Sequence, residues 1–336
     1  MKKDVIYQTD AISGLKTLDS ESIDCIVTSP PYWQLRDYGN EELLWGGNEQ
    51  CVHEFDYRKT CLKCGGWIGQ LGHEPVREMY INHLLMIFCE CQRVLKKTGT
   101  LWVNLGDSYS KPYKYNYANG SKLGSEKNRY SLKDMKVNHL AYRIASKSLC
   151  NIPGLFAEEM VRNGWILRNE IIWHKTSCIP ASVKDRFTVD FEKLFFFTKK
   201  EKYYFAQQFE PYAMSTLGRY KHSYSAKGGK NAVYRNKYGA PRGFLEINPN
   251  GRNKRTVWRI DAGNSKYMHF ASYPPKLIET PVKAGCPAGG VVLDPFTGSG
   301  TTAITAKRLG RHYIGIEPNA AYVEICKQRL KNLTDN

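Results

Sequence analysis

Residues 290–302, which read GVVLDPFTGSGTT, decide the fold of this chain of 336 residues. The apolar start predicts a buried strand that ends at Asp294, and the glycines that follow allow the backbone to turn tightly and approach a ligand closely. A helix is expected from Thr301, and the amide groups of its first turn would face a carboxylate or phosphate. A second strand over 312–317 ends in Glu317, an acid suited to two ribose hydroxyls. This unit favours a nucleoside ligand over an ordinary tight turn.

Outward from this unit, strands and helices alternate along the chain. The alternation indicates a Rossmann-like α/β fold with a doubly wound, mostly parallel sheet. Helices are expected over residues 11–18, 79–96, 152–162, 275–284, 301–309 and 319–332, and strands over 5–7, 23–27, 101–105, 165–173, 192–198, 290–294 and 312–317. The polar stretch Lys97–Gly99 is expected to separate the second helix from the strand that follows it.

The composition narrows the class of protein. Hydrophobic residues make up 42% and charged residues 24%, which excludes a globally disordered, collagen-like or coiled-coil chain. No apolar run reaches the ~18 residues of a membrane span, and the first residues lack a signal peptide, so we expect a cytoplasmic protein. The ten cysteines lie mostly in apolar contexts, as in a reducing compartment. The net charge of +17 favours a nucleic-acid partner over a basic surface kept for solubility.

A second motif follows the strand over 23–27. Ser29, Pro30, Pro31 and Tyr32 stand where that strand ends, and the two prolines fix the backbone and stop strand pairing. The Ser29 hydroxyl and the Pro30 carbonyl could both accept hydrogen bonds from one amino group, and Tyr32 offers a flat face to a planar base. Taken alone, the motif is equally well explained as a proline-rich turn.

Together the two motifs resemble those of the S-adenosylmethionine-dependent amino-methyltransferases of DNA, which carry a D-P-F-x-G-S-G-T cofactor loop and an S/D/N-P-P-Y loop for the target amine. The amine loop comes first here, as in the permuted β group, and the resemblance covers roughly residues 5–205 and 267–332. It implies a circularly permuted methyltransferase fold, S-adenosylmethionine as cofactor and double-stranded DNA as partner.

The resemblance also implies which residues bind the cofactor. Thr301 and Thr302 would hold its methionine carboxylate, Glu317 its ribose, and Asp10 would lie near its adenine. Ser272 belongs to a short segment that would cover the methionine end. The complete implied set is Asp10, Ser272, Asp294, Pro295, Phe296, Gly298, Ser299, Gly300, Thr301, Thr302 and Glu317, with Ser29, Pro30, Pro31 and Tyr32 at the target amine.

The implied reaction is direct transfer of a methyl group to the exocyclic amine of a base flipped out of the duplex. In the family, Ser at the position of Ser29 leans toward cytosine N4, whereas Asp or Asn leans toward adenine N6, so we favour cytosine and keep adenine as the alternative. Methylation of cytosine carbon 5 would need a Pro-Cys pair, which the sequence lacks. More distant alternatives are an RNA or protein amide methyltransferase and a non-catalytic DNA-binding protein on this fold.

Four residues with metal-binding side chains form two short pairs, Cys51 with His53 and Cys61 with Cys64. Three thiolates and an imidazole suit a closed, structural zinc site, and the Cys61 half resembles a zinc knuckle. The spacing of the Cys51 half is tighter than usual, and a chance grouping of cysteines in a loop is the alternative.

The stretch over 199–260 carries fourteen Lys or Arg residues against three Glu, which suits contacts to DNA phosphates. A subset, Arg252, Arg255 or Arg259, could read guanines. The polar loop over 106–136 is also basic and could close over DNA or simply be disordered. Asp107 could line the target pocket or cap the next turn, and Lys184–Arg186 could touch DNA or shape the pocket wall.

These motifs divide the chain into four parts. We expect a catalytic part over 1–45 and 74–198, a zinc-binding insertion over 46–73, a target-recognition region over 199–266 and a cofactor-binding part over 267–336. The resemblance implies a prokaryotic or phage modification enzyme and suggests a cognate restriction endonuclease as a partner. It leaves open whether the chain forms a homodimer.

Overall fold

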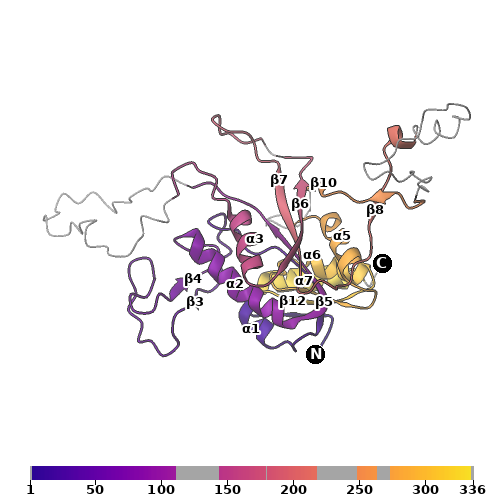
Figure 1. Ribbon diagram of the computed structural model, residues 1–336. Coiled ribbons are helices and arrows are strands. Elements are labelled where there is room, and N and C mark those ends of the chain that lie inside the picture. The colour runs from indigo at the N-terminus through magenta and orange to yellow at the C-terminus, as the bar shows by residue number, and fades with distance from the viewer. Residues whose placement is uncertain (1, 111–143, 179, 218–247, 263–272, 334–336) are drawn as a thin grey trace, which may run out of the picture.

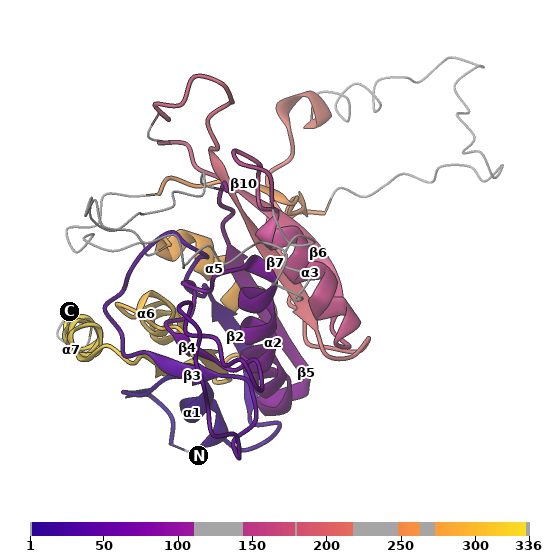
Figure 2. The ribbon, with the colours of Figure 1, turned by 90° about the vertical axis from the view of Figure 1, so that its left-hand side faces the viewer.

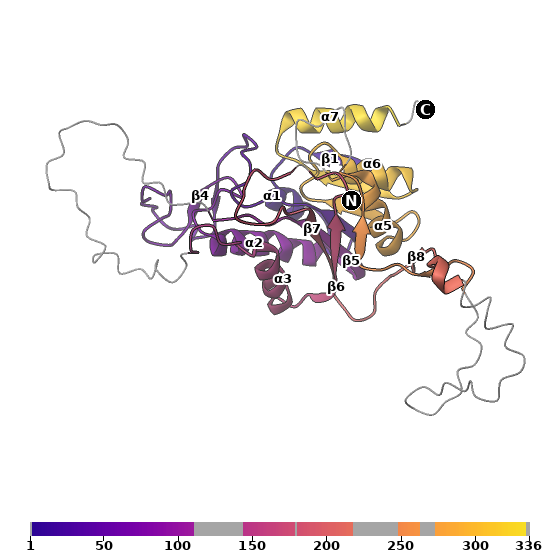
Figure 3. The same ribbon diagram turned by 90° about the horizontal axis from the view of Figure 1, so that it is seen from above.

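The computed structural model describes residues 2–110, 144–178, 180–217, 248–262 and 273–333. In these residues an eight-stranded sheet lies between two layers of helices, which Figure 3 shows from above (Figures 1–3). The strands follow the order β1-β12-β11-β2-β5-β7-β6-β10.

The strands of this sheet are β1 (Val5–Tyr7), β2 (Ile23–Thr28), β5 (Leu95–Leu105), β6 (Ile166–His174), β7 (Phe191–Thr198), β10 (Val257–Arg259), β11 (Val291–Asp294) and β12 (His312–Ile316). The helices are α1 (Ala11–Lys16), α2 (Arg77–Val94), α3 (Ile152–Arg162), α5 (Pro275–Gly285), α6 (Thr301–Arg308) and α7 (Ala320–Lys331). Two short antiparallel pairs join β3 (Leu43–Trp45) to β4 (Trp67–Gly69) and β8 (Phe209–Glu210) to β9 (Arg252–Asn253). Among the described residues, no helix is long and apolar enough to cross a membrane.

The expected doubly wound, mostly parallel sheet is confirmed. Strands β1, β12, β11, β2 and β5 are paired in parallel, and so are β6 and β10. Only β7 runs against its neighbours β5 and β6 among the strands of this sheet that the structure describes. Because both faces are covered by helices, the central strands are apolar nearly throughout.

Alternate residues of the central strands pack into two separate hydrophobic cores, one on each face of the sheet. Phe195 and Phe197 of β7 pack on the side of α1, α2 and α3. Leu194 and Phe196 pack on the side of α5, α6 and α7, where Phe196 stacks flat on Trp102 with ring centroids 4.0 Å apart. The period of two in a strand thus anchors both helix layers to one sheet.

The boundary between α2 and β5 differs from the sequence prediction. The helix ends at Val94 and the strand begins at Leu95, so Lys97–Gly99 lies inside the strand and does not separate the two elements. Leu95 already pairs with Ile23, and the register shifts before the main ladder begins. Gly99 permits this because a Cβ atom there would come within 2.6 Å of the Leu95 side chain.

Strands β2 and β11 lie side by side at the centre of the sheet, with Cys25 opposite Val292 and Ile26 opposite Leu293. After β2 the chain passes to α2 on one face, whereas after β11 it passes to α6 on the other. The loops that leave two such strands diverge and open a crevice at the carboxyl edge of the sheet, where ligands bind in folds of this kind.

Candidate active site

Asp294, the last residue of β11, connects the two loops that the sequence marks as functional. Its Oδ1 atom accepts hydrogen bonds from the Thr28 hydroxyl at 2.6 Å and the Phe296 amide at 3.0 Å. Its Oδ2 atom accepts from the hydroxyls of Thr302 at 2.6 Å and Tyr273 at 3.0 Å. Burial raises the pKa of this carboxyl, which is only 1% exposed. The side chain of Asp294 therefore connects the carboxyl end of β2 and the start of α6 to the end of β11.

The loop after β11 depends on its glycines. Gly298 and Gly300 have φ angles of +52° and +86°, and a Cβ atom on Gly300 would lie 2.2 Å from the Cys326 sulfur of α7. The Gly298 amide donates to Glu317 Oε2 at 2.9 Å, and the Asn319 amide donates to Glu317 Oε1 at 2.9 Å. Glu317 is thus held at the end of β12, and burial raises its pKa.

A cavity of about 670 Å³ opens at the carboxyl edge of the sheet, within the size range of small-ligand sites. Its wall includes many of the residues predicted for the cofactor and the target amine: Asp10, Pro295, Phe296, Gly298, Ser299, Thr301 and Glu317 from the first set, and Ser29 and Pro31 from the second. Asp294, Gly300, Thr302, Pro30 and Tyr32 are not among the residues that line the cavity, and Ser272 lies outside the described residues.

Two of the predicted cofactor residues form hydrogen bonds within the protein. Asp10 caps the first turn of α1, since its carboxylate accepts a hydrogen bond from the Ser13 amide at 2.9 Å. Thr302 was expected to hold a carboxylate of the ligand, but its buried hydroxyl is bonded to Asp294 and lies 2.5 Å from the Tyr273 hydroxyl. Thr301 is therefore the threonine of this pair that faces the cavity.

The loop after β2 is held in place by a hydrogen bond from α2. The Tyr80 hydroxyl of α2 donates to the Pro31 carbonyl at 2.7 Å, and the rings of Pro30 and Pro31 restrict the backbone on either side. Ser29 is half-buried and lines the cavity. The hydroxyl of Ser29 donates to the Tyr32 hydroxyl at 3.4 Å.

Comparison with known proteins agrees with this geometry. The family model described as DNA methylase matches residues 23–328. The chain is 34% identical over 331 residues to the Type II methyltransferase M.Cfr9I of Citrobacter freundii, covering 98% of this chain and 89% of the relative. This chain belongs to the DNA methylase family.

Two solved structures share the fold of this DNA methylase. The PvuII DNA methyltransferase (cytosine-N4-specific) superposes with a TM-score of 0.57 at 17% identity, over 100% of this chain and 91% of the other. A protein from Thermus thermophilus described as a putative DNA modification methylase, solved with S-adenosyl-L-methionine, gives a TM-score of 0.52 at 20% identity over 97% and 94%. The circularly permuted methyltransferase fold expected from the two motifs is thereby confirmed.

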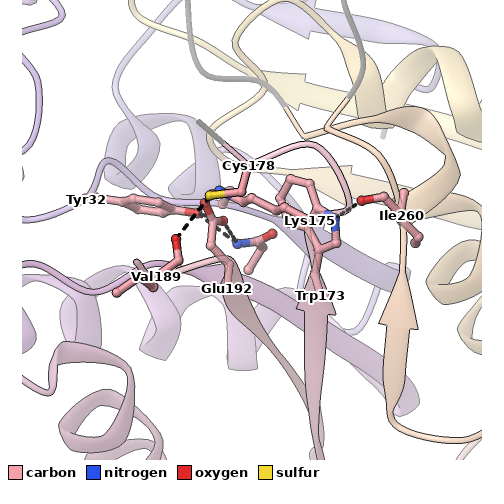
Figure 4. Close-up of polar contacts among 9 residues, drawn as sticks. Tyr32, Trp173, Lys175, Cys178, Val189, Glu192 and Ile260 are labelled. Atoms are coloured by element: carbon pink, nitrogen blue, oxygen red, sulfur yellow. Dashed lines mark hydrogen bonds and ion pairs between the residues drawn. The ribbon is translucent and has the colours of Figure 1, made fainter. Parts of the chain in front are cut away.

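Tyr32 of this DNA methylase is held by residues that the sequence analysis missed (Figure 4). Its hydroxyl donates to Glu192 Oε2 at 2.6 Å and accepts from Asn104 Nδ2 at 2.8 Å. Glu192 also forms an ion pair with Lys175 at 2.5 Å. Burial, and then the Glu192 carboxylate, raises the pKa of Tyr32 well above its usual value, so this hydroxyl stays protonated at neutral pH. The sequence signal was a polar residue, Asn104, at the end of one expected strand and an acid, Glu192, at the start of the strand over 192–198.

Asp107 makes the capping contacts that were one of its two alternatives. Its carboxylate accepts hydrogen bonds from the Ile152 amide at 3.0 Å and from the Ser108 amide at 2.9 Å, so it caps the start of α3. Asp185 pairs with Lys147 at 2.7 Å, on the loop between β6 and β7.

The four predicted metal ligands come together in the β3–β4 insertion, residues 46–73. The ligand atoms of Cys51, His53, Cys61 and Cys64 all lie within 4.8 Å of one another, so the cluster could hold a metal ion. The Cys51 and Cys61 sulfurs are 3.9 Å apart. Burial raises the pKa of the Cys61 thiol. Hydrogen bonds from backbone amides, with that of Cys64 first among them, outweigh burial and lower this pKa to about 5. Thiolates are the form in which cysteine binds metals.

The strands that flank the metal cluster also form part of the cavity wall, through Leu43, Trp45, Gly69, Gln70 and Leu71. His83 of α2 fixes them, because its ring stacks on Trp45 and Trp67 with centroids 5.2 and 5.7 Å apart. Its Nδ1 atom lies 2.9 Å from Glu74 Oε1, and both residues are buried. The strands that flank the insertion thus pack on α2 and also line the cavity.

The expected DNA-reading arginines are partly engaged within the chain. Arg252 and Arg255 both bind Glu210, at 2.9 and 2.6 Å. These ion pairs hold β8 and β9 together where the chain enters and leaves residues 218–247. Seven of the fourteen basic residues counted over 199–260, and most of the loop over 106–136, lie outside the described residues.

Proposed function

We propose that this DNA methylase transfers a methyl group from S-adenosylmethionine to an exocyclic amine of a base in double-stranded DNA. The observation that carries the proposal is the hydrogen bond from Thr28 to Asp294, because it fixes the loop of Ser29 against the glycine loop across one cavity. The expected ribose acceptor Glu317 and the first turn of α6 line the same cavity. The solved relative from Thermus thermophilus that carries S-adenosyl-L-methionine adds support.

The bound donor would supply an electrophilic methyl group on a sulfonium, and the chain's own residues would prepare the amine. An exocyclic amine is a weak nucleophile because its lone pair is conjugated with the ring. Hydrogen bonds from its N–H groups to the Ser29 hydroxyl and the Pro30 carbonyl would favour a tetrahedral nitrogen with a localised lone pair. That nitrogen forms the new N–C bond as the S–C bond breaks, and the amine then loses a proton to solvent. Alignment of the two reactants supplies much of the rate.

Cytosine N4 is the target that we favour. Ser29 offers a neutral acceptor, whereas an aspartate at this position would make charge-assisted hydrogen bonds. The PvuII enzyme, whose fold is similar, is described as cytosine-N4-specific, and this adds modest support. Adenine N6 is the second candidate within the same family.

The test incubates the purified chain with labelled S-adenosylmethionine and duplex DNA of mixed sequence, and then identifies methylated nucleosides by mass spectrometry. N4-methylcytosine is the expected product. N6-methyladenine would keep the reaction and overturn the base. Label in RNA or protein, or cofactor binding with no labelled product, would refute the proposal in favour of another substrate or a non-catalytic DNA-binding protein.

We also propose that the Cys51, His53, Cys61 and Cys64 cluster holds a structural zinc ion. Zinc–sulfur bonds of about 2.3 Å in a tetrahedron place ligand atoms about 3.8 Å apart, close to the observed sulfur separation of 3.9 Å. Elemental analysis should find one zinc per chain. Cys64→Ser should lose it, whereas Cys89→Ser, at an exposed cysteine of α2, should keep it. Equal zinc in both variants would refute the assignment.

The likeness to a Type II methyltransferase further suggests a cognate restriction endonuclease that recognises the same site. Protection of DNA methylated by this chain against a candidate endonuclease would test this partner. No described contact bears on a homodimer, and gel filtration with light scattering addresses that expectation.

A further inference from the structure

The loop between β6 and β7, residues 175–190, projects beyond the carboxyl edge of the sheet (Figures 1 and 2). Its two arms are tied together near the sheet. The Lys175 amide donates to the Asp190 carbonyl at 2.8 Å, and Cys178 Sγ donates to the Val189 carbonyl at 3.5 Å (Figure 4). His174 Nε2 also lies 3.2 Å from Asp190 Oδ2. The base of the loop is therefore a fixed stem.

The stem is connected directly to the site of the target amine. Lys175 lies over the Trp173 ring at 4.9 Å and pairs with Glu192, the residue that accepts the Tyr32 hydrogen bond. Trp173 is itself fixed by a hydrogen bond from its indole to the Ile260 carbonyl at 2.9 Å. Through these contacts, the direction in which the loop projects is set relative to Tyr32.

The tip of the loop exposes an aromatic ring among positive charges. Phe187 is 95% exposed, the most exposed of the large apolar side chains that the structure describes. Lys184 and Arg186 beside it are exposed, and Arg186 lies over the Tyr109 ring at 3.4 Å. The acid between them, Asp185, is neutralised by its ion pair with another loop. An apolar ring flanked by cations matches a polyanion with stacked, apolar bases in its interior.

We propose that Phe187 is the wedge that enters the duplex where the target base leaves it. This inference rests on the proposed function, since only an enzyme that extrudes its target needs to fill or open the base stack. Phe187 is five residues from Glu192, so its backbone lies within about 17 Å of that residue, a reach shorter than the width of a duplex. Apolar side chains inserted between base steps unstack them in other DNA-binding proteins. Phe187 is thus a positioning residue that acts on the DNA and not on the reacting atoms.

The test compares Phe187→Ala with the wild type in single-turnover methylation at the sequence that the wild type methylates. One duplex is fully paired, and the other has an abasic site opposite the target, which removes the cost of opening the pair. On paired DNA we expect a loss of about ten- to hundredfold, the usual effect of removing one base–aromatic stack. On the abasic duplex the variant should approach the wild-type rate. Phe187→Trp should keep activity on both.

Val161→Ala provides the matched control, since Val161 is 46% exposed on α3, away from the β6–β7 loop. It should match the wild type on both duplexes, and S-adenosylmethionine affinity should be equal in all variants. An equal loss on both duplexes, no loss at all, or a change in oligomeric mass on Phe187→Ala would overturn the wedge. A wild type that methylates no duplex would instead refute the proposed function, and the wedge with it.

Discussion

Ser29 lines the cavity, and the expected role of its hydroxyl is to accept one hydrogen bond from the target amine. Ser29→Ala should therefore slow methyl transfer by about tenfold or more, the equivalent of one hydrogen bond made in the transition state, with little change in S-adenosylmethionine affinity. Single-turnover rates and calorimetric titration measure the two effects separately. Ser13→Ala, at an exposed serine of α1, serves as the control. A variant at wild-type rate would contradict the account of amine activation.

Asp294 gives a prediction about pH. Burial raises its pKa in the folded chain, so the folded state holds this proton more tightly than the unfolded state does. Its contribution to the free energy of unfolding is fully present below the ordinary aspartate pKa of about 3.9 and is lost as pH rises through the raised pKa.

The change that tests this is Asp294→Asn. Asparagine cannot titrate and places an amide where hydroxyl donors point, so the variant should be less stable by about 1–3 kcal/mol. The difference between wild type and variant should shrink as pH rises from about 4 to about 8. Urea unfolding across that range measures it. A difference that grows with pH would show that the ionised carboxylate is the stabilising form.

At the scale of elements, the β3–β4 insertion makes one prediction about metal removal. The strands that flank the Cys/His cluster supply Trp45 and Gly69 to the cavity wall, and His83 of α2 stacks on the tryptophans of both strands. Chelation of the proposed zinc ion, or Cys61→Ser, should therefore weaken S-adenosylmethionine binding by about tenfold or more, because an ordered wall is lost. Circular dichroism should still report the intact sheet, and Cys89→Ser should bind as the wild type does. Unchanged affinity after metal loss would separate the insertion from the cofactor site.

The elements also explain what the sequence could predict. The glycine loop, Glu317 and the metal cluster were accessible because their residues lie close in sequence or at predictable strand ends. The roles of Asn104, Glu192 and Lys175 were not, because they depend on β7 entering the sheet antiparallel between β5 and β6. The hydrogen bond from the Thr302 hydroxyl to Asp294 could not be predicted either, because the position of Asp294 depends on the pairing between β11 and β2.

At the scale of the molecule, the net charge of +17 and the position of the cavity act together. The carboxyl edge carries both functional loops and the β6–β7 loop. A duplex that approaches this edge would meet the amine loop and the exposed cations Lys184 and Arg186 at once. Attraction to phosphates would bring DNA to the site before any base is read.

This arrangement predicts a strong dependence of DNA binding on salt. Each phosphate contact contributes about −0.9 to the slope of log affinity against log salt, so roughly six to ten contacts imply a loss of about 10³- to 10⁵-fold between about 50 and 200 mM salt. Fluorescence anisotropy with a labelled duplex measures the slope. S-adenosylmethionine binding, for which we propose the cavity where backbone amides hold Glu317, should change little over the same range. A shallow slope for DNA would mean that the positive charge lies away from the DNA-binding surface and that shape and stacking provide most of the affinity.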